Sequence, residues 1–331
     1  LDVRAALGWG ADQYTDGKIH GYMGLMPDGT LWAATHRGPK PTDAWYEAGY
    51  RGSWLLSYNI HSGESRNWGV PLVGNSLPYF SVDTRRGIFF GTGENETLLS
   101  WDVHAKRVRY AGYPPNGWKW YQVSVQLHDV DTGIFWGADV SEKPYRFLSF
   151  DPELNRFERH ELELPCNPVT GEQGVLRHNT SEPDGEGWYY CFAGGEGGGT
   201  LFRFRPAGAE GPEVETLAVT SGEKGALVHQ IELCPAKRYV YYVPRRRDAM
   251  IVMQYDIRTG THKALGFLSE AIFSAYGYWA GNGTYGMNLS EDGSRLVILE
   301  NGDFAGRGSG FGGYPAVLVV DIPESERLVN P

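Results

Sequence analysis

The chain alternates short apolar, β-branched or aromatic runs with polar turns, and the stretch from Ala226 to Leu268 shows this most clearly. It holds three such runs, Ala226–Leu233, Tyr239–Val243 and Met250–Tyr255, and the last is followed by the turn sequence Asp256–Gly260. Runs of this length and composition predict β-strands, and the turns between them predict an antiparallel meander.

The second, third and fourth runs of this unit recur along the chain. Second runs occupy 31–35, 88–92, 134–138, 188–192, 239–243 and 296–300. Third runs occupy 54–59, 98–102, 147–151, 201–205, 251–256 and 317–321. More polar fourth runs follow at 65–68, 107–110, 156–159 and 262–265. A four-stranded unit that repeats six times at roughly 45–57 residues is typical of a β-propeller.

We therefore predict an all-β protein, with residues 1–331 forming a single β-propeller domain of four-stranded antiparallel blades. Six blades are counted, and a seventh would need a repeat that is not evident in the sequence. A β-sandwich with similar turn spacing is the alternative. The segment Leu1–Leu7 is expected to supply an outer strand.

Composition narrows the class of protein. The net charge is −10, which argues against nucleic acid as a partner because that needs a basic surface. No apolar run approaches the ~18–20 residues that span a bilayer, so no membrane segment is expected. The three cysteines suggest no disulfide framework and are expected to be small buried residues. Sequons such as Asn95-Glu-Thr favour a secreted or periplasmic location, and a cytoplasmic one stays open. Nothing indicates an oligomeric state.

Candidate catalytic residues come from the expected start of each inner strand, which lines the channel of a propeller. Nine residues before the end of each hairpin turn lie His20, Pro78, Ser124, His178, His229 and Tyr285. Blades four, five, six and one are neighbours if six blades close, so four of these positions form an arc. We predict that this arc is catalytic; ordinary polar histidines bound to water or backbone are the alternative. The predicted catalytic residues are His229, His178, Tyr285 and His20.

Cations and aromatic rings are expected on the same face. An arginine fork suits a carboxylate, and clustered cations in an acidic protein attract an anionic ligand. Sugars stack on aromatic rings. The alternative for the arginines is a solvated surface run, and the alternative for the aromatic rings is packing within the blades. The predicted substrate-binding residues are Arg246, Arg245, Arg177, His36, Arg37, Trp120 and Tyr278. No cofactor is expected, and a divalent metal held by His20, His178 and His229 is a minor alternative.

Five segments carry a resemblance to known enzymes: Tyr239–Pro244, Gln254–Gly260, Lys263–Leu268, Gly283–Gly286 and Asp292–Ser294. Over Ala226–Asp321 the chain resembles the β-propeller polysaccharide lyases and glycoside hydrolases, which include ulvan lyases and enzymes that cleave rhamnose–glucuronate linkages. The resemblance implies that histidine, tyrosine and arginine perform the elimination. His178, His229, Tyr285, His20 and Arg246 match those roles by type and position.

The sequence therefore predicts a carbohydrate-active enzyme that cleaves a uronate-containing glycan, an acidic oligo- or polysaccharide, by β-elimination. Arg246 or Arg177 would neutralise the carboxylate, His229 or Tyr285 would act as base, and Tyr285 or His178 as acid. A glycoside hydrolase, α-L-rhamnosidase-like, is an alternative, although the usual paired carboxylates are missing from the mapped positions. A non-catalytic propeller that binds a glycan or protein is the other alternative.

Overall fold

The computed structural model describes residues 18–19, 21–36, 49–121, 127–208, 210–221, 225, 227–245, 250–277, 279–280, 284–300 and 316–327. At positions 18, 221, 227, 229, 245, 284, 285 and 300 the description covers the backbone only. The chain divides into two compact units, Leu1–Glu161 and Leu162–Pro331, which we take in turn.

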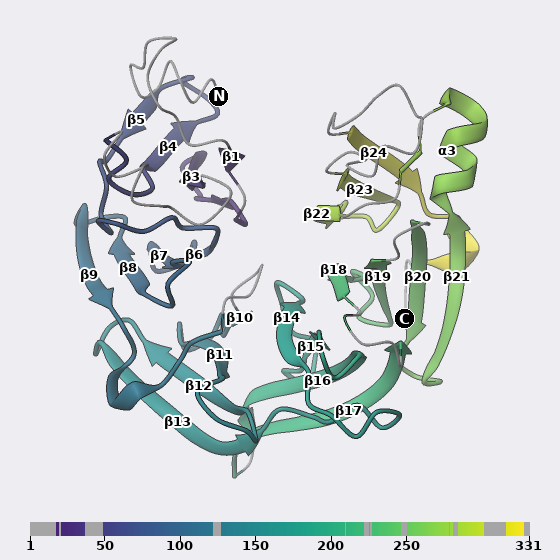
Figure 1. Cartoon of the computed structure of the whole chain (residues 1–331). Coiled ribbons are helices and arrows are strands. Elements are labelled where there is room, and N and C mark those ends of the chain that lie inside the picture. Colours follow the sequence, from purple (N-terminus) through teal and green to yellow (C-terminus); the bar gives the residue numbers. More distant parts are fainter. Residues whose placement is uncertain are drawn as a thin grey trace. The chain divides into compact units, whose positions relative to one another are not determined.

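Unit 1 contains three antiparallel sheets (Figure 1). The first comprises β1 (Lys18–Ile19), β2 (Gly24–Leu25), β3 (Thr30–His36), β4 (Leu55–Asn59) and β5 (Ser65–Asn67). The second comprises β6 (Tyr79–Asp83), β7 (Ile88–Thr92), β8 (Leu98–Asp102) and β9 (Arg107–Gly112). The third comprises β10 (Leu127–His128), β11 (Phe135–Asp139), β12 (Arg146–Asp151) and β13 (Arg156–Glu163). A short 3₁₀ turn, Pro115–Gly117, precedes this third sheet.

Unit 2 also contains three antiparallel sheets. The first comprises β14 (Val175–Asn179), β15 (Tyr189–Gly194), β16 (Gly199–Gly208) and β17 (Gly211–Ser221). The second comprises β18 (Leu227–Leu233), β19 (Tyr239–Arg245), β20 (Ile251–Asp256) and β21 (Thr261–Phe267). Three described strands form the last: β22 (Thr284–Leu289), β23 (Arg295–Glu300) and β24 (Ala316–Asp321). The helix α3 (Leu268–Tyr276) follows β21, and a 3₁₀ turn, Glu324–Glu326, follows β24.

In five of the sheets the described strands follow their order in the sequence, and each pairs antiparallel with the next. In the first sheet β1 and β2 both pair with β3, which continues to β4 and β5. Six such sheets are the blades of a six-bladed β-propeller, so the predicted fold class is confirmed. The predicted second and third runs of blade two coincide with β7 and β8. The outer strand predicted at Leu1–Leu7 lies outside the described residues.

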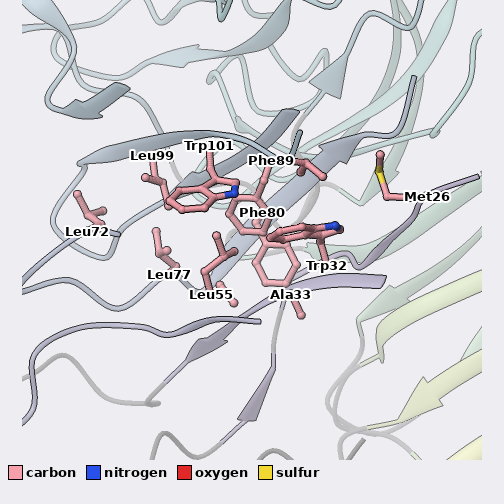
Figure 2. Packing of buried hydrophobic residues seen from close by; sticks show 12 residues of the cluster. Met26, Trp32, Ala33, Leu55, Leu72, Leu77, Phe80, Phe89, Leu99 and Trp101 are labelled. Atoms are coloured by element: carbon pink, nitrogen blue, oxygen red, sulfur yellow. The ribbon is translucent and has the colours of Figure 1, made fainter. Parts of the chain in front are cut away.

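Apolar positions that alternate along neighbouring strands form the cores between blades. Figure 2 shows the cluster between the first two sheets, in which Trp32, Phe80, Phe89 and Trp101 are almost fully buried. The rings of Phe80 and Phe89 stack with centroids 5.0 Å apart. A β-carbon at Gly21 would lie 2.2 Å from the Phe80 ring, so glycine at this position lets the first sheet approach the second.

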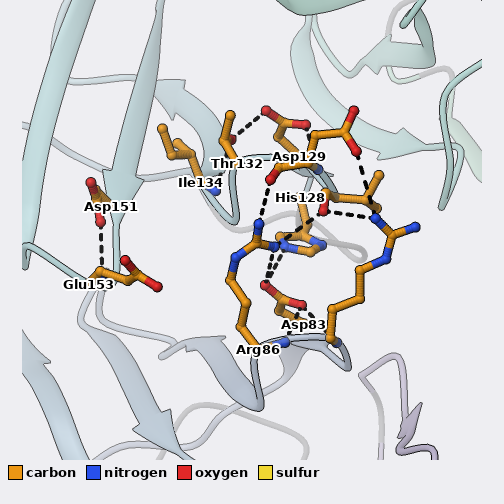
Figure 3. A network of polar contacts seen from close by, with 11 residues as sticks. Asp83, Arg86, His128, Asp129, Thr132, Ile134, Asp151 and Glu153 are labelled. Atoms are coloured by element: carbon orange, nitrogen blue, oxygen red, sulfur yellow. Dashed lines mark hydrogen bonds and ion pairs between the residues drawn. The ribbon is translucent and has the colours of Figure 1, made fainter.

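Acidic side chains hold several of the hairpin turns, among them the turn after β6 (Figure 3). The Asp83 carboxylate accepts hydrogen bonds from the backbone of Arg85 and Arg86, both at 3.0 Å. Its Oδ2 atom also lies 3.0 Å from Nε2 of His128. Burial alone would raise the pKa of Asp83, but its bonds with His128 and Arg86 outweigh it and lower the pKa to about 2. The Asp83 side chain is fully enclosed. Because Asp83 belongs to β6 and His128 to β10, their contact joins blades two and three.

Replacing Asp83 by alanine is expected to lower the free energy of unfolding by about 3–5 kcal/mol, because Arg86 would keep its charge without a partner and two turn amides would lose their buried acceptor. Urea unfolding at neutral pH measures the change. Asp292→Ala is the matched control, since Asp292 makes similar turn bonds to Ser290 and Ser294 while exposed to solvent. Equal losses in the two variants would contradict a special role for the buried pair.

The cysteines and the apolar segments were also subjects of prediction. Cys191 and Cys234 are buried as predicted, whereas Cys166 is exposed, so the prediction for Cys166 was wrong. Within the described part of the chain, no helix has the length and apolar character needed to cross a membrane.

Candidate active site on the inner strands of unit 2

The inner strands of the three blades of unit 2, β14, β18 and β22, are neighbours (Figure 1). Each contains a register shift against the second strand of its own blade. In β14 the pairing moves from Leu176–Ala193 to His178–Phe192, so Arg177 is the extra residue.

The same irregularity occurs in the next two blades. In β18 the pairing moves from Val228–Pro244 to Ile231–Tyr242, so His229 and Gln230 lie in the shifted segment. In β22 it moves from Thr284–Glu300 to Gly286–Leu299, which makes Tyr285 the extra residue.

A β-bulge of this kind turns a side chain away from the regular pleat, and bulges are over-represented beside active sites. The fold does not require one at this place, since β6 and β7 in unit 1 pair without interruption from Tyr79–Thr92 to Asp83–Ile88. The three bulges coincide with, or directly precede, the predicted positions His178, His229 and Tyr285. We name these segments of β14, β18 and β22 the bulge row.

His178 differs from its expected environment. It was predicted to start an inner strand, but β14 begins at Val175 and His178 is only 3% exposed. Asn179 next to it is also buried. His178 is therefore enclosed by protein, while the neighbouring Arg177 is half-buried.

The other predicted residues of blades five and six are placed by their backbone. Arg245 ends β19 and pairs with Leu227, two residues before His229, so Arg245 and His229 occupy the same end of blade five. The blade-six bulge contains Tyr285. The remaining predicted residues His20, Arg37, Arg246 and Tyr278, and the mapped position Ser124, lie outside the described residues.

His36 and Trp120 belong to unit 1. His36 is 5% exposed, and its Nδ1 atom lies 2.8 Å from Ser76 Oγ and 3.8 Å from Glu94 Oε1. Trp120 is fully buried and packs edge-on against Phe90 at 5.4 Å. A ring enclosed by protein cannot stack on a sugar, so the expectation for Trp120 is corrected to a packing role.

Glu232 is a candidate that the sequence reasoning missed. It lies in β18, three residues beyond His229, and is 8% exposed. Burial raises the pKa of Glu232 from 4.5 to about 8, so this carboxyl group holds a proton at neutral pH. A protonated buried carboxyl on an inner strand is able to serve as a general acid. The only sequence signal was an acidic residue between Ile231 and Leu233 in an apolar run.

A metal site requires several ligands in one place. No group of three or more histidine, cysteine or acidic side chains in the described residues is arranged to hold a metal ion. The minor alternative of a metal at His20, His178 and His229 depends on His20 and on the His229 side chain, which are outside the description, so it stays a prediction.

No protein-family model matches the sequence, and a comparison with curated proteins gives no match. Solved structures do match. A protein from Lactobacillus plantarum has a TM-score of 0.58 and 12% identity, covering 90% of this chain and 80% of that chain. An oligogalacturonate lyase in complex with manganese has a TM-score of 0.54 and 10% identity, covering 93% and 90%. The periplasmic gluconolactonase of Pseudomonas aeruginosa has a TM-score of 0.53 and 14% identity, covering 92% and 89%. At these identities the likeness shows the fold that the sequence repeats predict.

Proposed function

We propose that this chain is an enzyme that cleaves a uronate-containing glycan by β-elimination, with the bulge row as its active site. The observation that carries the proposal is the succession of three bulges at Arg177–His178, His229–Gln230 and Tyr285. That an oligogalacturonate lyase and a gluconolactonase share the fold supports a substrate of sugar-acid type.

The first requirement of the reaction is a cation beside the substrate carboxylate. Neutralising that group makes the proton on the adjacent C5 atom easier to remove. Arg177 is half-buried in the blade-four bulge, where a charge interacts more strongly than in bulk water. Arg245 lies at the same end of blade five as His229. A guanidinium offers two parallel donors to a carboxylate. Arg246 follows Arg245 in the chain and is a further candidate for this role.

The second requirement is a base and an acid on either side of the scissile bond. In our assignment His229 removes the C5 proton, the C4=C5 double bond forms, and the C4–O bond breaks. The leaving oxygen takes a proton from Tyr285 or from Glu232, whose carboxyl group is protonated. His178 is enclosed, so we assign it to positioning the bulge row. His20 remains a predicted participant.

Hydrolysis is the second candidate, and Glu232 is the observation that favours it. A protonated carboxyl is the usual general acid of glycoside hydrolases, including any that cleave rhamnose–glucuronate linkages. The usual mechanism also needs a second carboxylate, and the sequences of β14 and β22 contain no acidic residue. Because these two strands offer no second carboxylate, we prefer elimination to hydrolysis.

Incubation with a panel of acidic polysaccharides, such as polygalacturonate, alginate and ulvan, tests the proposal. Elimination creates an unsaturated uronate, so ultraviolet absorbance should rise in step with new reducing ends. Reducing ends without absorbance would establish a hydrolase instead. No turnover on any acidic glycan would favour a binding protein.

The partner we propose is therefore an acidic oligo- or polysaccharide, with neither nucleic acid nor membrane involved. We also propose a secreted or periplasmic location, because such a polymer is found outside the cytoplasm and the similar gluconolactonase is periplasmic.

A further inference from the structure

A pocket of about 370 Å³ opens in unit 1 between the first two blades, at the end where their hairpin turns lie. This volume is within the range of small-ligand sites. Its lining combines indole rings with charges of both signs, and none of it comes from the bulge row. The lining includes the rings and charged side chains of Trp32, Trp68, Lys106, Asp28, Glu64 and Arg66.

The two indole rings form one wall of the pocket. Trp32 and Trp68 stack with centroids 5.5 Å apart and planes inclined by 22°. Trp32 is buried, whereas Trp68 is partly exposed. The Trp68 Nε1 atom donates a hydrogen bond to Ser57 Oγ at 2.9 Å, which fixes the ring. Trp68 therefore presents a rigid aromatic surface to the pocket.

Lys106 places a cation against that wall. Its Nζ atom lies 5.0 Å from the Trp68 centroid and 5.3 Å from the Trp32 centroid. The residue has φ +56°, in the left-handed region. The equivalent turn positions of blades one, three and five are Gly63, Asn155 and Gly260, which are residue types suited to that region. The Lys106 ammonium donates a hydrogen bond to the carbonyl of Val103, another lining residue, so the cation is held beside the two rings.

The charges around the pocket are balanced. Asp28 and Glu64 supply two carboxylates, and Lys106 and Arg66 supply two cations, with Arg66 Nε 2.8 Å from Glu64 Oε1. An anion would meet both carboxylates and a protein of net charge −10, and a cation would meet Lys106 and Arg66. A neutral polyhydroxylated ring can use the acceptors and the donors together.

We propose that this pocket binds a neutral sugar residue, with the C–H face of the ring on Trp68 and hydroxyl groups bonded to the charged rim. The proposal goes beyond the proposed function and rests on residues of unit 1 alone. The binding itself does not depend on that function.

The test is calorimetric titration of the full chain with methyl α-L-rhamnoside, methyl β-D-glucoside and methyl β-D-galactoside, followed by D-galacturonate. At least one neutral glycoside is expected to bind, and Trp68→Ala should weaken that binding by about tenfold or more. Trp118→Ala, which alters another partly buried indole of the same unit, should leave it unchanged.

Lys106→Asn is the sharper variant, because asparagine already occupies the equivalent left-handed position at residue 155. The melting temperature should be maintained or rise while the affinity for the glycoside falls. Unchanged affinity in this variant, stronger binding of D-galacturonate than of the neutral glycosides, or no binding of any of them would overturn the proposal. Since the readout is binding, failure here is distinct from failure of the lyase proposal, which is measured by turnover.

Discussion

Replacing His229 by alanine is expected to lower kcat on the true substrate by about 10²–10⁴-fold, the usual contribution of a general acid or base. The expectation follows from its place in the blade-five bulge, at the same end of the blade as Arg245. Turnover should be measured on the polysaccharide that gives the strongest ultraviolet signal with the unaltered protein. His61→Ala, which removes an exposed histidine outside the bulge row, should retain full activity.

Melting temperature separates a catalytic histidine from a structural one. His229→Ala should melt within a few degrees of the unaltered protein if its role is chemical. His178→Ala should lose stability as well as activity, because His178 is enclosed. Full turnover in His229→Ala would remove this residue from the mechanism.

Replacing Glu232 by glutamine is expected to stabilise the protein at alkaline pH and to leave it unchanged in acid. Burial raises the pKa of Glu232 from 4.5 in the unfolded chain to about 8 in the folded protein. Below pH 4.5 both states hold the proton. Between the two pKa values only the unfolded state releases it, so the stability of the unaltered protein falls by about 1.4 kcal/mol per pH unit. Above pH 8 the loss is complete.

Urea unfolding at pH 4.5 and at pH 8 measures this difference. The Glu232→Gln variant should match the unaltered protein at the lower pH and exceed it by about 3–5 kcal/mol at the higher. Glu186→Gln, an exposed replacement in the same unit, should show no such pH dependence. A difference that is the same at both values would mean that Glu232 keeps an ordinary pKa.

Much of the fold was predictable because strand composition and turn residues are local signals. The runs 88–92 and 98–102 coincide with β7 and β8, since each is bounded by residues that suit turns. The bulges were not predictable, because a register shift depends on pairing with another strand. The start of β14 was misplaced for a related reason. The loop from Asn179 to Tyr189 is longer than the one from Asp83 to Ile88, so a fixed residue count does not transfer between blades.

Burial explains what was missed or misassigned in the candidate site. A tryptophan in a β-rich sequence either faces a ligand or fills a core, and only the structure places Trp120 against Phe90. The chemistry of Glu232 likewise depends on its surroundings, since the same residue exposed to water would be ionised at neutral pH. His229 and Tyr285 were predicted from blade positions that recur in the sequence, and their roles stay predictions.

We propose that the bulge row binds and cleaves a uronate. The most direct test is a crystal structure of the His229→Ala variant with an oligosaccharide of the polysaccharide that the unaltered protein degrades. We expect a uronate carboxylate bonded to Arg177 or Arg245, with the scissile oxygen beside Tyr285 or Glu232. An oligosaccharide bound with its uronate away from β14, β18 and β22 would contradict it.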